Sequence, residues 1–169
     1  MQVQHSRQGE CAVSQASIQS AKTVRQLAIG AVQSIPEEWF DIQLKGFNNT
    51  IRWNVGHIIT LMDVFLVSGL SFDSKIPSRY SDLFNMGTKP ADWHDKPPSK
   101  EELLLSLSEQ LSSLSEVAPE KLSEPFSPPR EMGRLTFSCR DELFQFAFVH
   151  EALHLGVISS LVKGIQASK

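Results

Sequence analysis

The stretch RDELFQFAFVHEALHLGVISSLVK, residues 140–163, is the part of the sequence that decides the fold. Its inward positions recur at alternating steps of four and three residues, the spacing of a helix in the core of a bundle. These positions are Leu143, Ala147, His150, His154, Val157 and Leu161. The pattern therefore predicts a helix with two histidines on its buried face.

Three further segments show helical periodicity, and no stretch shows the sustained alternation that is typical of a strand. The first, residues 14–35, ends before Pro36, since a proline disfavours helix in the residue before it. The second covers residues 50–69. The third begins at Ser99, where Ser99 and Glu102 have the spacing of a capping box. The four segments predict an all-α protein, a four-helix bundle.

The connection between the second and third predicted helices, Phe72–Pro98, is long and holds four prolines. It also carries Tyr80, Phe84 and Trp93, so we expect an ordered crossover that packs its aromatic side chains on the bundle. At 169 residues the chain is long enough for one domain, residues 1–169. Residues 1–12 have little apolar content, and we expect them to be disordered.

Composition argues against several partners. The net charge is −3, and the 16 lysines and arginines are scattered, so we expect no nucleic-acid partner. The N-terminus has no apolar signal segment, and His57 and Asp63 interrupt the most apolar run, so we expect a cytoplasmic protein with no membrane partner. Cys11 and Cys139 are far apart in sequence, and we interpret both as free thiols.

The pentapeptide HEALH, residues 150–154, has the spelling of a zinc-protease motif. Residues four apart lie one turn apart on one helix face, so His150 and His154 can bind one metal ion. A protease of this class takes its third ligand from further along the chain. Here Ser160 stands where such a histidine would be, and no Asp, Glu or His follows His154. The sequence therefore argues against a protease.

A third ligand has to come from upstream, from His5, His57, His94 or a carboxylate. His5 is in the polar N-terminal segment, and His94 is in a charged cluster typical of a solvated loop. His57 lies inside a strongly apolar predicted helix, where an unsatisfied polar group costs about 1–3 kcal/mol. It could hydrogen-bond a carbonyl or Asp63, as a lone core histidine usually does, or it could share one cation with the other two histidines.

At this point the sequence resembles a known family, the DinB-like (DinB/YfiT) metal-binding four-helix proteins. The resemblance is carried by NTIRWNVGHI at residues 49–58, YSDLFNMGTKP at residues 80–90 and HEALHLG at residues 150–156. It covers nearly the whole chain. It implies that His57, His150 and His154 bind one divalent metal ion, zinc or nickel. Many relatives have glutamine at the position of Val157, so the hydrogen bond that it makes near the site is missing here.

The resemblance also implies a homodimer and, from characterised relatives, a thiol-dependent S-transferase or isomerase that uses a low-molecular-weight thiol such as bacillithiol or mycothiol on a small-molecule substrate. Arg52, Arg134 and Arg140 could pair with an anionic thiol, although single arginines are more often surface charges.

Two alternatives stay open. In a metal-dependent hydrolase, Glu151 would act as the catalytic general base on metal-activated water, although a solvent-facing helix residue is the interpretation that we favour for Glu151. In a non-catalytic, stress-linked protein, a metal or a small ligand would be bound without turnover. Such a structural site would be closed by a fourth protein ligand, for which Asp63 and His94 are the first candidates.

Overall fold

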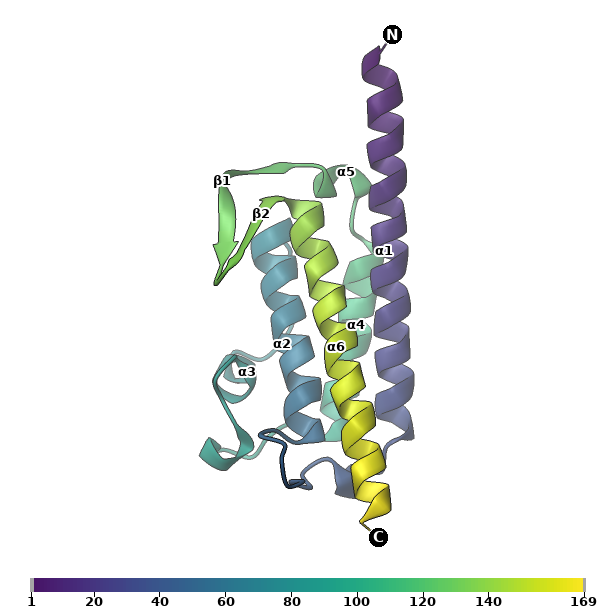
Figure 1. Cartoon of the computed structure of the whole chain (residues 1–169). Helices are drawn as coiled ribbons and strands as arrows, with labels where there is room; N and C mark the ends of the chain where they lie inside the picture. The colour runs from purple at the N-terminus through teal and green to yellow at the C-terminus, as the bar shows by residue number, and fades with distance from the viewer. Residues whose placement is uncertain (1, 169) are drawn as a thin grey trace.

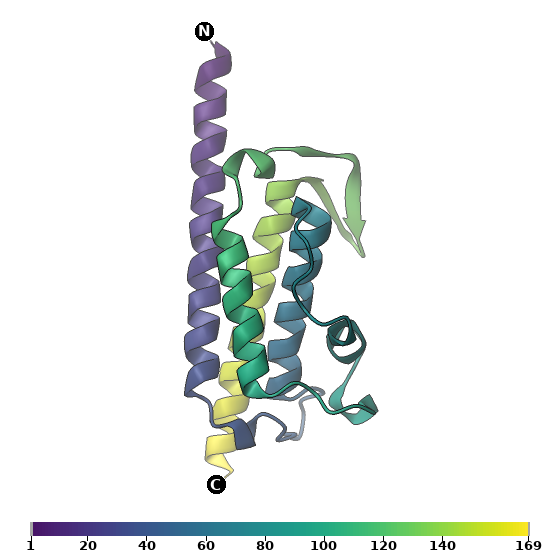
Figure 2. The ribbon, with the colours of Figure 1, turned by 180° about the vertical axis from the view of Figure 1, so that it is seen from behind.

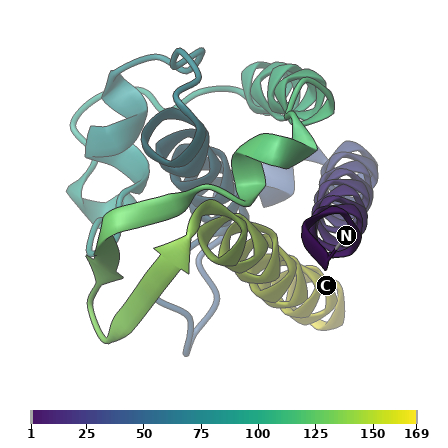
Figure 3. The same ribbon diagram turned by 90° about the horizontal axis from the view of Figure 1, so that it is seen from above.

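Four long helices lie side by side in a computed structural model that describes residues 2–168, with side chains described from Gln15 onward (Figure 1). The chain is mostly helical, as the sequence predicts. The long helices are α1 (Gln2–Ser34), α2 (Ile51–Leu70), α4 (Lys100–Ser115) and α6 (Arg140–Ala167). Each packs on two others, in the cyclic order α1, α4, α2, α6 that is visible along the bundle axis (Figure 3).

The predicted crossover between α2 and α4 is confirmed. It returns along the outside of the bundle, so α2 and α4 run in the same direction (Figure 2). It contains the short helix α3 (Arg79–Phe84), which packs on α2, and the 3-10 turn η2 (Pro90–Asp92). Another 3-10 turn, η1 (Glu37–Trp39), follows α1. Tyr80 and Phe84 are buried, so the crossover aromatics join the core as expected.

The helix ends follow local capping chemistry. The Ser99 hydroxyl accepts from the Glu102 backbone N–H, and the Glu102 carboxylate accepts from the Ser99 N–H, so the predicted capping box is present. Thr50 caps α2 by accepting from the Trp53 N–H. The helix α1 begins at Gln2 and so includes most of the segment, residues 1–12, for which the sequence predicts disorder. The side chain of Cys11 lies outside the described side chains, whereas Cys139 is a free thiol.

A small hairpin, for which the sequence showed no strand-like alternation, is added to the helices. After the short helix α5 (Pro119–Leu122), β1 (Pro125–Met132) and β2 (Leu135–Cys139) form an antiparallel hairpin. Its two-residue turn begins at Gly133, whose positive φ of 61° suits such a turn. The prolines in β1 interrupt the alternation by which a strand is recognised. Proline in a sheet is tolerated only at an edge or where the register is irregular. Arg130 and Arg140 donate to carbonyls in the last turn of α2, which anchors the hairpin there.

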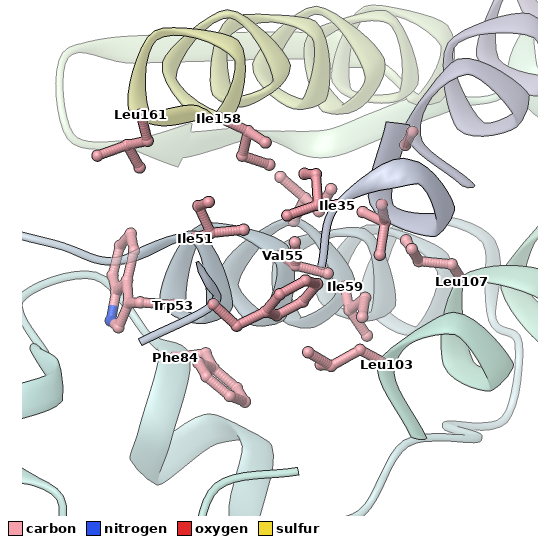
Figure 4. Packing of buried hydrophobic residues seen from close by; sticks show 14 of the residues in the cluster. Ile35, Ile51, Trp53, Val55, Ile59, Phe84, Leu103, Leu107, Ile158 and Leu161 are labelled. Atoms are coloured by element: carbon pink, nitrogen blue, oxygen red, sulfur yellow. The ribbon is translucent and has the colours of Figure 1, made fainter. Parts of the chain in front are cut away.

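The core consists of two apolar clusters along the bundle. Figure 4 shows the cluster around the N-terminal half of α2, where side chains from α4, α6 and the crossover surround Ile51, Val55 and Ile59. The other cluster lies toward α5 and the hairpin and includes Met62, Leu114 and Ala147.

By length and composition alone, α2 and α6 could each cross a membrane. The most apolar window of α2 is 72% buried inside the bundle, which its place in the core explains. The corresponding window of α6 is only 22% buried. Its place in the core therefore does not explain the apolar character of α6.

Candidate metal centre

Three histidines from two helices converge on one point. His57 comes from α2, and His150 and His154 come from one face of α6. Each offers a ring nitrogen, and these atoms all lie within 4.8 Å of one another. The ring centroids of His57 and His154 are 4.7 Å apart, and those of His150 and His154 are 4.5 Å apart. The structure therefore brings together the three residues that the sequence suggested as ligands.

The orientation of His57 is fixed by α3. Its Nδ1 lies 2.6 Å from the carbonyl oxygen of Phe84, and because a carbonyl only accepts, Nδ1 carries the proton and Nε2 is left free. The close approach of α3 depends on Gly56, since a Cβ there would lie 2.4 Å from the Phe84 ring. The glycine before the histidine thus lets the crossover reach the site.

The orientation of His154 is fixed by α2. Its Nδ1 lies 2.8 Å from Oδ1 of Asn54. The amide nitrogen of Asn54 donates to the Thr50 carbonyl at 2.8 Å, which identifies the other atom of the amide as the oxygen. His154 therefore donates through Nδ1 and keeps Nε2 free. Hydrogen bonds of this kind, on the far nitrogen of a ligating histidine, orient the ring and raise its basicity.

The three rings favour the neutral form. Burial lowers the pKa of His150 to about 4, and the neighbouring charge of a protonated His57 acts in the same direction. Burial also lowers the pKa of His154 to about 4, with His150 and His57 adding to the effect. The pKa of His57 is lowered by burial, partly offset by its bond to Phe84. At neutral pH the cluster thus presents imidazole lone pairs and not cations.

Aromatic rings wall the cluster. Trp53 stacks on His57 at 4.5 Å between centroids with only 15° between the planes, and its indole N–H donates to Thr88 at 2.8 Å. Phe146 lies 6.1 Å from His150. The signal in the sequence for the contact of Trp53 with the cluster is its position one helical turn before His57.

A pocket of about 480 Å³ opens beside His57. Its lining mixes polar and apolar residues and includes no acidic residue; it consists of Asn48, Asn49, Trp53, His57, Met86, Gly87, Thr88 and Lys89. Lys89 is therefore the cation at the pocket, on the loop after α3, where no sequence pattern identified it. A small molecule in this pocket would lie against one of the three histidines.

The donor set fits a divalent ion. Three neutral imidazoles suit zinc or nickel, and three protein ligands leave coordination positions for water or substrate. Among the residues that the structure describes, no carboxylate or thiol joins the cluster. The residues that would hold the ion are His57, His150 and His154.

Comparison with known protein families agrees with this geometry. A family model described as the DinB superfamily matches residues 21–158, which is most of the chain. The chain belongs to the DinB superfamily. A search of curated proteins found no match. Among solved structures, a conserved protein from Enterococcus faecalis is similar with a TM-score of 0.62 and 16% identity, over 92% of this chain and 98% of that one. At that identity the likeness concerns the fold alone.

The glutamate of the motif does not belong to the histidine cluster of this DinB protein. Glu151 is 1% exposed, so the solvent-facing interpretation is wrong. Its Oε2 accepts from Arg25 at 2.8 Å, on the side of α6 that faces α1. Consecutive residues on a helix diverge by about 100°, so Glu151 cannot share the face of His150. The candidate general base therefore has no geometric support.

The other residues suggested as ligands lie elsewhere. His94 is exposed in the crossover, and Asp63 accepts a hydrogen bond from Ser74. Neither belongs to the cluster, so neither closes the site as a fourth ligand. The side chain of His5 lies outside the described side chains.

The arginines suggested as anion partners are also placed elsewhere. Arg52 is buried and pairs with Asp41 at 2.8 Å, and Arg140 pairs with Glu124 at 3.0 Å. Arg134 is exposed in the turn of the hairpin. None of the three lines the pocket beside His57.

Proposed function

We propose that this DinB-family protein binds one divalent ion, zinc or nickel, through His57, His150 and His154 and uses it in thiol-dependent transfer to a small electrophile. One observation carries the proposal: three neutral imidazoles, two of them oriented by hydrogen bonds, meet beside a pocket, with no carboxylate among them. When bound, a divalent ion supplies the positive charge that favours a thiolate over a thiol near neutral pH. The thiol proton leaves to solvent, a bond forms between the sulfur and the electrophilic carbon, and the bond to the leaving group breaks.

This geometry favours thiol attack over hydrolysis. Hydrolysis assisted by a general base lacks its candidate here, because the carboxylate nearest in sequence, Glu151, is held by Arg25. A thiol that is already ionised needs no such base. Lys89 and the amides of Asn48 and Asn49 are available in the pocket to bind an anionic or polar part of the thiol or the acceptor.

The first experiment is metal content by mass spectrometry on untagged protein. We expect about one ion per chain in the wild type, loss of the ion in His57→Ala, and retention in His94→Ala, which removes an exposed histidine outside the cluster. The cobalt-loaded protein is then titrated with small thiols and followed by visible absorption. A wild type without metal, or a His57→Ala variant that keeps it, overturns the metal site.

The thiol titration separates the remaining functions. A change in the cobalt spectrum with 2-mercaptoethanol or mercaptoacetate supports thiol chemistry. A spectrum that responds to hydroxide but not to thiols points to the hydrolase. A spectrum that responds to neither indicates a closed, non-catalytic binding site.

We also propose that the protein forms a homodimer through the outer face of α6. Between Glu142 and Lys163 the only charged residue is Glu151, which is buried. Val149 is 49% exposed and Leu153 is 67% exposed, and the small residues Ala152, Gly156 and Ser160 are exposed on the same face. A surface helix without charge over several turns is typical of an interface.

The sequence of α6 is complementary to itself. If two copies pair antiparallel about a point between Ala152 and Leu153, Glu142 of one copy lies opposite Lys163 of the other, and Val149 lies opposite Gly156. A Cβ at Gly156 would meet nothing, so this position is open to a partner side chain. The unlike charges at the ends and the small residues at the centre both favour a second copy of this chain as the occupant.

Analytical ultracentrifugation tests the homodimer. We expect a dimer for the wild type, a monomer for Leu153→Lys, and a dimer for Leu105→Lys, which alters an equally exposed leucine on α4. A monomeric wild type, a dimeric Leu153→Lys, or a wild type that binds phosphatidylcholine vesicles through this face overturns the proposal.

A further inference from the structure

A buried polar network crosses the bundle and links all four long helices. From α1, Arg25 donates to Gln110 Oε1 on α4 at 2.8 Å and to Glu151 Oε2 on α6 at 2.8 Å. From α4, Gln110 Nε2 donates to the carbonyl oxygen of Ile59 on α2 at 2.9 Å. All three side chains are almost completely buried, with exposed fractions of 0% for Arg25 and 1% for Gln110 and Glu151.

The network lies between the two apolar clusters of the core. On each long helix, the core residues that precede the network and those that follow it belong to different clusters. The residues on one side are Ala28, Ile59, Leu107 and Ile158, and those on the other are Ala21, Met62, Leu114 and Ala147. Hydrogen bonds are directional, whereas apolar contacts tolerate sliding, so a polar layer at this point fixes the axial register of the helices.

The same layer contains the metal centre. Glu151 directly follows His150 and precedes His154 by three residues, and Ile59 follows His57 by two. The guanidinium of Arg25 holds Glu151 and therefore also fixes the rotation of α6 about its axis. That rotation determines whether His150 and His154 face His57.

Stability alone does not explain this network. Replacing a buried ion pair by well-packed apolar side chains is often neutral or stabilising, because the desolvation of both charges is avoided. Here Arg25 Nε and Glu151 Oε1 are buried without a hydrogen-bond partner among the described residues, which adds to the cost. The benefit of such a network lies in conformational specificity.

We infer that Arg25, Gln110 and Glu151 are positioning residues for the metal centre: they hold α6 against α2 at the rotation and register in which His57, His150 and His154 converge. The glutamate of HEALH thus acts through the helix that carries the two histidines and not on a substrate. The inference rests on the metal-binding part of the proposed function and does not depend on thiol chemistry.

The test is the double variant Arg25→Met/Glu151→Leu, which removes both charges together. We expect its metal-free form to unfold at the same temperature as the wild type or higher, while its affinity for Co²⁺ falls about 10–100-fold and its visible spectrum changes. The matched control is Leu114→Ala, a cavity in the apolar cluster beyond the network. We expect it to lower the unfolding temperature and to leave the affinity and the spectrum unchanged.

A second variant keeps the test decisive if the double variant does not fold. Arg25→Lys keeps the charge but cannot hold Glu151 and Gln110 with one planar fork. We expect an affinity between those of the wild type and the double variant. Wild-type affinity and spectrum in a folded double variant, or in Arg25→Lys if the double variant does not fold, would show that the network has no positioning role.

A measurement on the metal-free protein tests the positioning role separately from metal binding. The bond between His154 Nδ1 and Asn54 joins α6 to α2, and the imidazole ¹⁵N shifts of His154 report it. If the wild type binds no metal, the proposed function fails, and the shifts still decide the positioning role. Loss of the bond in the double variant but not in Leu114→Ala supports positioning, and its retention in both overturns it.

Discussion

The histidine cluster and the Arg25 network are both buried polar groups in an apolar bundle, and they use adjacent residues of α6. His150 and His154 face α2 and a pocket, and their lone pairs are free for a ligand. Glu151 faces α1 and is held by Arg25. The difference shows that one five-residue motif can serve two sites, because neighbouring side chains on a helix leave it in different directions.

The two regions also differ in how they keep charge out of the core. Burial lowers the pKa values of His150 and His154 to about 4, so these rings are neutral near pH 7 and present lone pairs. Burial raises the pKa of Glu151 and lowers that of Arg25, and the attraction between the two opposes both effects. The histidine cluster can accept a cation, whereas the Arg25 network already contains one, the guanidinium of Arg25.

Breaking the Arg25 network is expected to have the largest effect on stability. Arg25→Met leaves Glu151 buried without its partner, which costs about 3–5 kcal/mol of the free energy of unfolding. Urea denaturation of the metal-free protein measures it. Adding Glu151→Leu should restore most of the loss. A single variant within about 1 kcal/mol of the wild type would contradict the buried ion pair.

The second-largest expected effect is a loss of stability in acid, caused by protonation of the histidine cluster. The folded-state pKa values of His150 and His154, about 4, lie below the ordinary 6.5, so the unfolded chain binds more protons between these values. The metal-free protein should therefore keep this stability above about pH 6.5 and lose it as the pH falls toward about 4. Thermal unfolding across this range measures the loss. His150→Gln should flatten the profile, and an equal slope in both proteins would contradict the shifts.

Crowding the contact between α2 and α3 is expected to have a smaller effect. Gly56→Ala forces a Cβ against the Phe84 ring, and overpacking of this kind costs about 1–3 kcal/mol. It should also move the carbonyl that orients His57 and so weaken Co²⁺ binding. Calorimetry and a cobalt titration measure both effects. In Gly30→Ala, where a Cβ would meet nothing, we expect a gain of about 0.5–1 kcal/mol.

Removing the partner of His154 is expected to have the smallest effect of the four. Asn54→Ala deletes the acceptor at Nδ1 and should lower metal affinity about 10-fold, or about 1.4 kcal/mol. Competition with a chromophoric chelator measures the affinity. Asn85→Ala, which alters an exposed asparagine at the end of α3, should leave it unchanged. If Asn54→Ala binds metal as the wild type does, the tautomer of His154 is not set by this bond.

Much of the fold follows from local sequence patterns. The periodicity predicted the regions of the four long helices, and the capping box at Ser99 was predicted in full. The three histidines were recognisable because each is polar at an inward position of an apolar helix. The hairpin was not recognisable, because prolines interrupt β1, and the position of Glu151 was wrong, because nothing local identifies Arg25 as its partner.

The sequence by itself determined an all-α protein of the DinB family with three inward histidines, since helical spacing and family motifs are properties of the chain alone. Only the tertiary structure decided which nitrogen of His57 and His154 is free, which cation neutralises Glu151, and which loop borders the pocket. Each of these depends on contacts between residues far apart in sequence, such as Arg25 with Glu151 and His154 with Asn54. Such contacts are set by how the helices rotate against one another, which no local pattern encodes.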